Sequence, residues 1–283
     1  MRAAVDASWT FDPVPIAMLV ALAVAYALRF RRVRAAAANH RSHQAVAYAR
    51  RHDAPRWRAA LFGLALLAAA AALVSPIDRL GEQVLTMHMV QHLLLLDVAP
   101  ILGILAFTRV LLRPVTRRVM EIERAAGFLA HPVFAAVLYV ATMAFWHVPA
   151  LYDAALEHPA IHVLEHVTFT VAGGLYWWHL LSPIPGRHRL TGMGPVIYMV
   201  ATKIGVGLLG IVITFAPDAL YAFYEHRGDV WGMSPSTDQQ VAGALMAVEQ
   251  SIVMGIALAW LFMRMLGESQ RSDERVERLS PPA

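Results

Sequence analysis

Two histidines lie four residues apart in the segment "TMHMVQH", residues 86–92, at the start of a long apolar run. Side chains at this spacing project from the same face of an α-helix. Imidazole binds copper, zinc and iron, and a thioether selects the soft ion Cu(I). Because Met87 and Met89 flank His88, the segment predicts one wall of a metal site, with copper favoured among the metals.

A second run of histidines has the same helical spacing. In "HPAIHVLEH" they follow one another at intervals of four residues, with Glu165 on the same stripe. The predicted metal ligands are His88, His92, His147, His158, His162 and His166. The residues expected to support them are Met87, Met89, Met143, Glu165, Asp238, Gln239 and Gln240. The chain has no cysteine, which excludes thiolate metal sites, iron–sulfur clusters and c-type haem.

The elements that position these residues are predicted to be membrane-spanning helices. Hydrophobic residues form 58% of the 283-residue chain, and the mean hydropathy is +0.51. Soluble domains have roughly 45–50% apolar residues. Seven segments approach the ~20 apolar residues that a helix needs to cross a bilayer. They lie at about 13–30, 57–75, 84–107, 132–151, 159–182, 194–216 and 239–266.

The predicted fold class is therefore all-α: a polytopic membrane protein built as a bundle of seven transmembrane helices. No linker or soluble unit interrupts the pattern, so we expect a single membrane domain over residues 1–283, with a cytoplasmic tail at 268–283. Asp6 and Asp12 precede the first apolar segment, in place of the basic n-region of a signal peptide. This segment is expected to be retained and not cleaved as a signal peptide.

The distribution of arginine predicts the direction of the helices. Lysine and arginine total 24, and Lys203 is the only lysine, so the chain has 23 arginines. Twenty of them lie at 29–58, 109–124, 187–189 and 264–278, all on one side of the predicted bundle. By the positive-inside rule, that side is cytoplasmic. The N-terminus is then expected outside, and the candidate metal ligands fall in the outer leaflet.

A deeper polar set surrounds Lys203, which lies within the sixth predicted span. A buried ammonium group needs a carboxylate partner. Asp97, Glu249 and Glu165 lie at comparable predicted depths. The sequence predicts a buried ion pair between Lys203 and one or two of these acids. The pair is either a structural link between helices or part of a proton relay.

The motifs "MHMVQHLLLLDVAPILG", "FWHVPALYDAALEHPAIHVLEH", "GGLYWWHLL" and "STDQQVAGALM" occur in this order along the chain. Together they resemble the CtaG family of bacterial cytochrome c oxidase assembly factors, over residues 57–266. The resemblance implies a non-enzymatic protein of the bacterial plasma membrane that helps to mature haem–copper oxidase, with copper handling as its expected task. In this chain it points to the six histidines, Asp238, and Gln239 or Gln240. Ala247 departs from the family pattern, which has a tryptophan there.

Two other functions remain open from the sequence. Histidines on different helices can also be axial ligands of haem b in an electron-transfer protein. Lys203 and its acids are compatible with a transporter of protons or small solutes. The formal net charge of +4 is assigned to loops that face anionic lipid and not to nucleic-acid binding. The expected partners are the bilayer and the subunits of haem–copper oxidase.

Overall fold

The computed structural model describes residues 5–39, 42–184, 186–227 and 229–279, and over these residues the chain is all-helical. The long helices are α1 (Pro13–Ala38), α3 (Arg56–Leu73), α7 (Arg109–Ala126), α8 (Pro132–Trp146), α10 (Pro159–Leu181), α11 (Gly194–Thr214) and α13 (Pro235–Leu279). The short ones are α2 (His43–His52), α4 (Pro76–Gly81), α5 (Leu85–Leu93), α6 (Ala99–Leu105), α9 (Pro149–Glu157) and α12 (Ala222–Glu225). A π-helix (Leu94–Val98) joins α5 to α6, and a 3₁₀-helix (Gly127–Ala130) follows α7.

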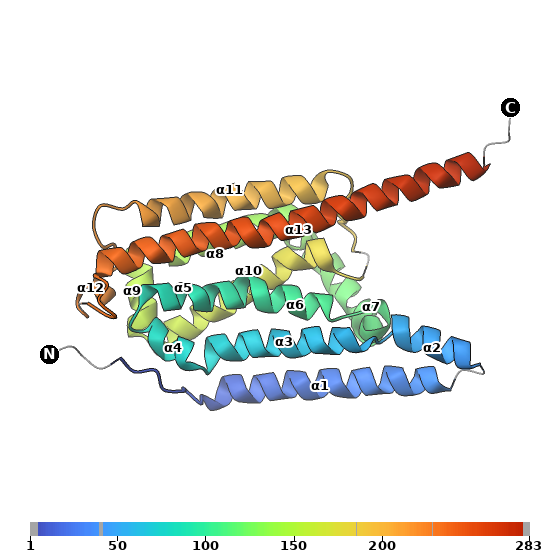
Figure 1. The fold of residues 1–283 in the computed structure, drawn as a ribbon, viewed down its shortest axis with the longest axis horizontal. Coiled ribbons are helices and arrows are strands. Elements are labelled where there is room, and N and C mark those ends of the chain that lie inside the picture. Colours follow the sequence, from blue (N-terminus) through green and yellow to red (C-terminus); the bar gives the residue numbers. More distant parts are fainter. Residues whose placement is uncertain (1–4, 40–41, 185, 228, 280–283) are drawn as a thin grey trace.

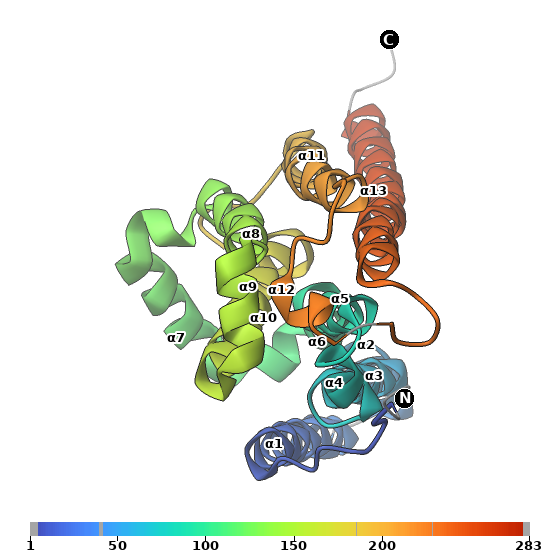
Figure 2. The same ribbon diagram turned by 90° about the vertical axis from the view of Figure 1, so that its left-hand side faces the viewer.

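The long helices other than α7 lie roughly along one common axis (Figure 1), and α7 is bent away from it. They are stacked from α1 at one edge, through α3, the α5–α6 segment and α10, to α11 and α13 at the other edge. Viewed along this axis, α5 and α6 lie between α3 and α10, and α7 lies at the periphery (Figure 2). The short helices α4, α9 and α12 gather at one end of the bundle, and α2 and α7 lie at the opposite end.

Prolines mark where several of these helices begin. A proline occupies the first turn of α1, α8, α9 and α10. N–H groups in the first turn of a helix have no acceptor within the helix, so the missing N–H of proline costs nothing there. The fixed φ of proline also matches the helical value. Pro149 and Pro159 therefore divide the chain between Trp146 and α10 into a separate helix, α9. The fourth predicted span, 132–151, ends earlier than expected for this reason.

Four helical segments of the described chain are long and apolar enough to cross a membrane. They are α1, α3, the continuous run Leu85–Leu105, and α11. A fifth is present if Arg109–Ala130 and Pro132–Trp146, bent by 65° relative to each other, form one broken span. The predicted span 159–182 coincides with α10, which is 23 residues long but carries three histidines and a glutamate. The predicted span 239–266 lies within α13, which continues to Leu279. The tail expected from residue 268 therefore begins as a helix. Residues 280–283 lie outside the described chain.

The third span is interrupted by the π-helix at Leu94–Val98. Proline at position 100 has no N–H to donate to the carbonyl of Leu96, four residues earlier. Single turns of π-helix inside α-helices occur frequently at functional sites. The π-helix begins two residues after His92 and places Asp97, which is fully buried, below the histidine pair.

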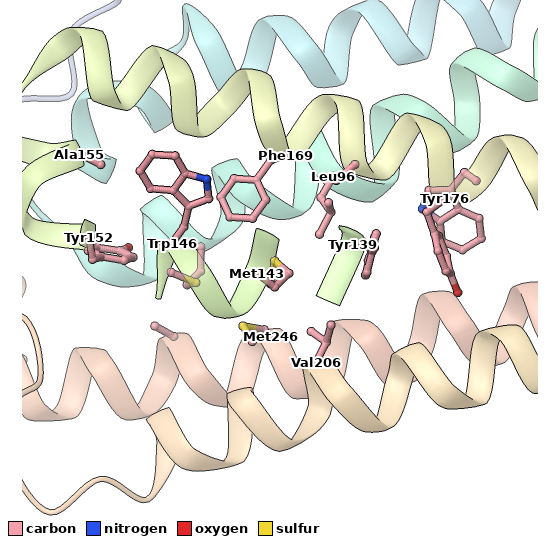
Figure 3. Close-up of a cluster of buried hydrophobic side chains, with 14 of the residues drawn as sticks. Leu96, Tyr139, Met143, Trp146, Tyr152, Ala155, Phe169, Tyr176, Val206 and Met246 are labelled. Carbon is pink, nitrogen blue, oxygen red and sulfur yellow. The ribbon is translucent and has the colours of Figure 1, made fainter. Parts of the chain in front are cut away.

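A core of aromatic side chains and methionines fills the centre of the bundle (Figure 3). It extends from Tyr152 and Trp146, near the end with α9, to Tyr139 and Tyr176 further along the axis. Several of these side chains are completely buried, including Tyr139, Tyr152, Phe169 and Tyr176. This rigid core supports the helices that carry the candidate ligands.

Candidate metal centre

The first histidine pair is held in place by an acidic side chain from a distant helix. The Asp238 carboxylate on α13 accepts hydrogen bonds from the backbone N–H groups of Leu85 (2.6 Å) and Thr86 (3.0 Å). These groups lie in the first turn of α5, where N–H donors lack intrahelical partners. Asp238 therefore caps α5. His88 and His92 follow one turn apart, and each is only 1% exposed.

Helix α10 brings the second histidine pair beside the first. The ring centroids of His88 and His162 are 5.4 Å apart, and those of His92 and His166 are 6.1 Å apart. Along the helices, His88 and His92 are separated by 4.3 Å and His162 and His166 by 4.2 Å. Both helices start at the end of the bundle that carries α4 and α9 (Figure 1). The four rings thus form two rungs, with the His92–His166 rung one turn deeper.

The carboxylate of Glu165 lies between the two rungs and is fully buried. Its Oε2 is 3.5 Å from Nε2 of His88, and its Oε1 is 3.3 Å from Nε2 of His92. Two groups of side chains have ligand atoms that all lie within 4.8 Å of one another. One consists of His88, His162 and Glu165, and the other of His92, Glu165 and His166. Glu165 is shared by both.

Many buried polar atoms of this cluster form no hydrogen bond of good geometry, although Glu165 lies 3.3 Å from His92 and 3.5 Å from His88. Eight buried atoms are unsatisfied: both ring nitrogens of His88 and of His92, Nε2 of His162 and of His166, and both carboxylate oxygens of Glu165. A buried polar group without a partner costs about 1–3 kcal/mol, and more if it is charged. So many in one place is unusual for a folded protein. A metal cation fits this donor set, because it would bind the nitrogen lone pairs and offset the carboxylate charge.

His147 adds a nitrogen–sulfur pair next to the deeper rung. Its Nδ1 lies 2.7 Å from the backbone carbonyl oxygen of Met143, and since a carbonyl only accepts, Nδ1 carries the proton. The lone pair of Nε2 then points to Sδ of Met89, 3.4 Å away. The His147 ring is 6.0 Å from that of His92. The predicted ligand His147 and the predicted supporting residues Met89 and Met143 are therefore brought together at the cluster.

Other residues predicted for the site lie outside this cluster. His158 is exposed, because it precedes the first turn of α10 and its side chain is not on the buried stripe. Met87 is half-buried and Gln240 is exposed. Gln239 is buried and holds the loop before α12, where its side-chain oxygen accepts a hydrogen bond from the N–H of Leu220 (2.6 Å).

Two of the acids predicted to pair with Lys203 have other contacts among the described residues. Asp97 instead accepts hydrogen bonds from the hydroxyl of Tyr139 (2.8 Å) and the indole N–H of Trp177 (2.6 Å). Glu165 faces the histidines. Lys203 itself is partly buried within α11, and its ion pair stays a prediction.

Two residues that the sequence did not single out are buried on the helices near the cluster. The Tyr152 ring on α9 is completely buried, 5.1 Å from the His88 ring. Gln91 is also completely buried, and its amide donates hydrogen bonds to the carbonyl of Ala72 and to the carboxylate of Asp78, both at 2.7 Å. Burial raises the pKa of Asp78, while hydrogen bonds such as that from Gln91 oppose the rise. The quoted motifs contained Gln91 and Tyr152, but periodicity gave them no role.

Comparison with known proteins identifies the family. The sequence profile of the cytochrome c oxidase caa3 assembly factor family, Caa3_CtaG, matches residues 24–268. The chain therefore belongs to this family of oxidase assembly factors, as the resemblance of its motifs predicted. Together with its apolar helices, this membership indicates a helical membrane protein.

Three mycobacterial proteins, each described as uncharacterised, are similar to this chain. The Mycobacterium leprae protein is 23% identical over 291 aligned residues, covering 95% of this chain and 40% of the relative. Proteins of Mycobacterium bovis and Mycobacterium tuberculosis are each 26% identical over 262 residues, covering 84% of this chain and 36% of the relative. The chain thus spans less than half the length of these relatives. No solved structure matches it.

Proposed function

We propose that this chain binds copper at the histidine cluster and supplies it to haem–copper oxidase during assembly. The observation that carries the proposal is the set of eight unsatisfied buried polar atoms on two histidine rungs around one carboxylate. Family membership indicates the process, which is oxidase assembly. The types of ligand atom in the cluster indicate the metal. Imidazole nitrogens with an adjoining thioether suit copper, and the thioether favours Cu(I).

In this proposal the chain is a seven-span protein of the bacterial plasma membrane, and its N-terminus is outside. The support is the placement of 20 of the 23 arginines on one side. The end of the bundle with α4, α9 and α12, where α5 and α10 begin, is then the outer end (Figure 1). Copper in the cluster lies toward the outer side, and the client subunit receives it there.

The packing of the cluster favours copper over haem b. Axial ligation of haem requires two histidines on opposite faces of a planar macrocycle. Here the rings of one rung are 5.4 Å apart, those of the other are 6.1 Å apart, and the Glu165 carboxylate occupies the space between the rungs. This space fits single ions rather than a macrocycle.

The proposal is tested in cells that lack the chain and receive plasmid-borne variants. We expect the His88→Ala/His92→Ala variant to leave oxidase without copper, with spectroscopically normal haem a but low activity. The matched control, His158→Ala/His188→Ala, also removes two histidines, both away from the cluster, and should restore full activity. An absorption spectrum of the purified parent should contain no Soret band. A Soret band, or full restoration by the first variant, would contradict the proposal.

A further inference from the structure

The two oxygens of the Glu165 carboxylate face different histidines. Oε2 approaches Nε2 of His88 at 3.5 Å, and Oε1 approaches Nε2 of His92 at 3.3 Å. His88 and His92 belong to different rungs. The carboxylate therefore lies across the two rungs, in the orientation of a bridge and not of a ligand that chelates one ion with both oxygens.

The ligand atoms also fall into two sets instead of one. His88, His162 and Glu165 are within 4.8 Å of one another, and so are His92, His166 and Glu165. No group of this kind contains all four histidines, although all four belong to the described chain. The only residue common to the two sets is Glu165.

We propose that Glu165 bridges two copper ions, one held by His88 and His162 and the other by His92 and His166. This inference rests on the proposed copper function and specifies how many ions the site holds. Each ion has two imidazole nitrogens and one carboxylate oxygen as ligands. Bridged pairs of metal ions recur in proteins, with separations of about 3.5–4 Å.

The distribution of unsatisfied atoms favours both ions. One ion at His88, His162 and Oε2 would leave Nε2 of His166 buried without a partner, and Nε2 of His92 with only its 3.3 Å approach to Oε1. One ion at His92, His166 and Oε1 would likewise leave ring nitrogens of His88 and His162 without a metal. Buried polar groups are nearly always partnered in folded proteins, and two ions are the smallest number that binds a donor from every member of the cluster.

The net charge of the buried site indicates the oxidation state of the two copper ions. Glu165 is the one carboxylate in the two ligand sets, so the protein contributes one negative charge. Two Cu(I) ions leave a net charge of +1, whereas two Cu(II) ions leave +3 in a buried site. Uncompensated buried charge is strongly unfavourable. The site is therefore a Cu(I) pair, in agreement with the thioether of Met89 beside the deeper rung.

The number of ions is measured by titrating the purified, metal-free protein in detergent with Cu(I) under anaerobic conditions, against a chromophoric Cu(I) chelator. We expect two equivalents to bind to the parent. One equivalent would overturn the bridged pair but leave the proposed copper function standing. No binding would overturn both. Near-edge X-ray absorption should show Cu(I); a Cu(II) edge after anaerobic loading would contradict the charge argument.

Single variants separate the two positions. His88→Ala removes a ligand from one position and His92→Ala from the other, so each should retain one equivalent. Glu165→Gln keeps the size of the side chain but removes the bridging anion, and should bind at most one equivalent. Two equivalents in Glu165→Gln would overturn the bridge. The control His158→Ala should bind two.

A measurement on the parent alone does not depend on the folding of any variant. Extended X-ray absorption of the doubly loaded protein should contain a copper–copper scattering path in the range of about 3.5–4 Å that is typical of two-metal sites. With one equivalent added, this path should weaken. Two equivalents without a copper–copper path would mean two independent sites and would overturn the bridge.

Discussion

Gly173 on α10 lies directly against the backbone carbonyl of Leu96 in the π-helix. A Cβ atom at position 173 would be 1.9 Å from the Leu96 oxygen and 2.7 Å from its carbonyl carbon. The two backbones meet one to two turns below the histidine rungs. This contact sets the separation of the two helices that carry the ligand pairs, and it explains why the sequence has glycine at this position.

We expect Gly173→Ala to force α5 and α10 apart. Overpacking typically costs about 1–3 kcal/mol, and occasionally more, and here the contacting atom belongs to rigid backbone. Thermal unfolding in detergent should show a lower melting temperature, and the copper affinity should fall because the rungs no longer align.

Gly174→Ala provides the matched control. A Cβ at position 174 meets no atom within 4 Å. Alanine has a higher helix propensity than glycine, by about 1 kcal/mol, so this variant should be as stable as the parent or more stable. Equal destabilisation by both substitutions would show that close approach to Leu96 does not set the helix separation.

Loss of the cap on α5 should destabilise the histidine pair. Asp238→Ala removes the acceptor of two backbone N–H groups in the first turn, at a cost of about 0.5–2 kcal/mol. We predict weaker copper binding and faster hydrogen exchange of the amides at the start of α5, with partial recovery in Asp238→Asn. Substitution of the exposed neighbour in Gln240→Ala should change neither quantity. Unchanged exchange in Asp238→Ala would disprove the capping role.

The thioether beside His147 should discriminate between metals. Met89→Leu conserves volume but removes the sulfur that lies 3.4 Å from Nε2 of His147. Because a thioether favours the soft Cu(I) ion, Cu(I) affinity should fall at least several-fold while Zn(II) affinity stays the same. The control is Met87→Leu, which should leave both affinities unchanged. Parallel losses of Cu(I) and Zn(II) would indicate a packing defect instead.

The orientation of the bundle predicts the behaviour of reporter fusions. A fusion after Met120 should behave as cytoplasmic and a fusion after Glu225 as external, because 20 of the 23 arginines lie on the side that includes α7. Alkaline phosphatase and green fluorescent protein report the two sides in a complementary way. The opposite pattern at both positions would place the copper cluster at the cytoplasmic end.

Helical periodicity predicted the part of the site that depends only on which face a residue occupies. The four-residue spacing of His88, His92, His162 and His166 placed two pairs on two helices, and the structure brings these pairs together. The same spacing includes His158, but the helix starts at Pro159, so the stripe ends one turn earlier than expected. Periodicity gives no information on where a helix begins within a stripe.

The role of Glu165 and the contribution of Tyr152 depend on tertiary packing. The sequence placed Glu165 on the correct stripe as a supporting residue, but which atoms its two oxygens face is decided by the offset between α5 and α10. Tyr152 reaches His88 because the chain breaks after Trp146 and restarts as α9 at Pro149. The predicted span 132–151 continued through this break, so the sequence did not predict the change of direction. Lys203 was assigned a buried partner from its depth alone, and this ion pair stays a prediction.

The most direct test of the copper function is the amount of copper per protein in three purified proteins loaded under identical conditions. These are the parent, the His88→Ala/His92→Ala variant, and the His158→Ala/His188→Ala control. Elemental analysis should find copper in the parent and the same amount in the control. In the His88→Ala/His92→Ala variant copper should be almost absent, because both ligand sets have lost a histidine. Equal copper in all three proteins would contradict the account.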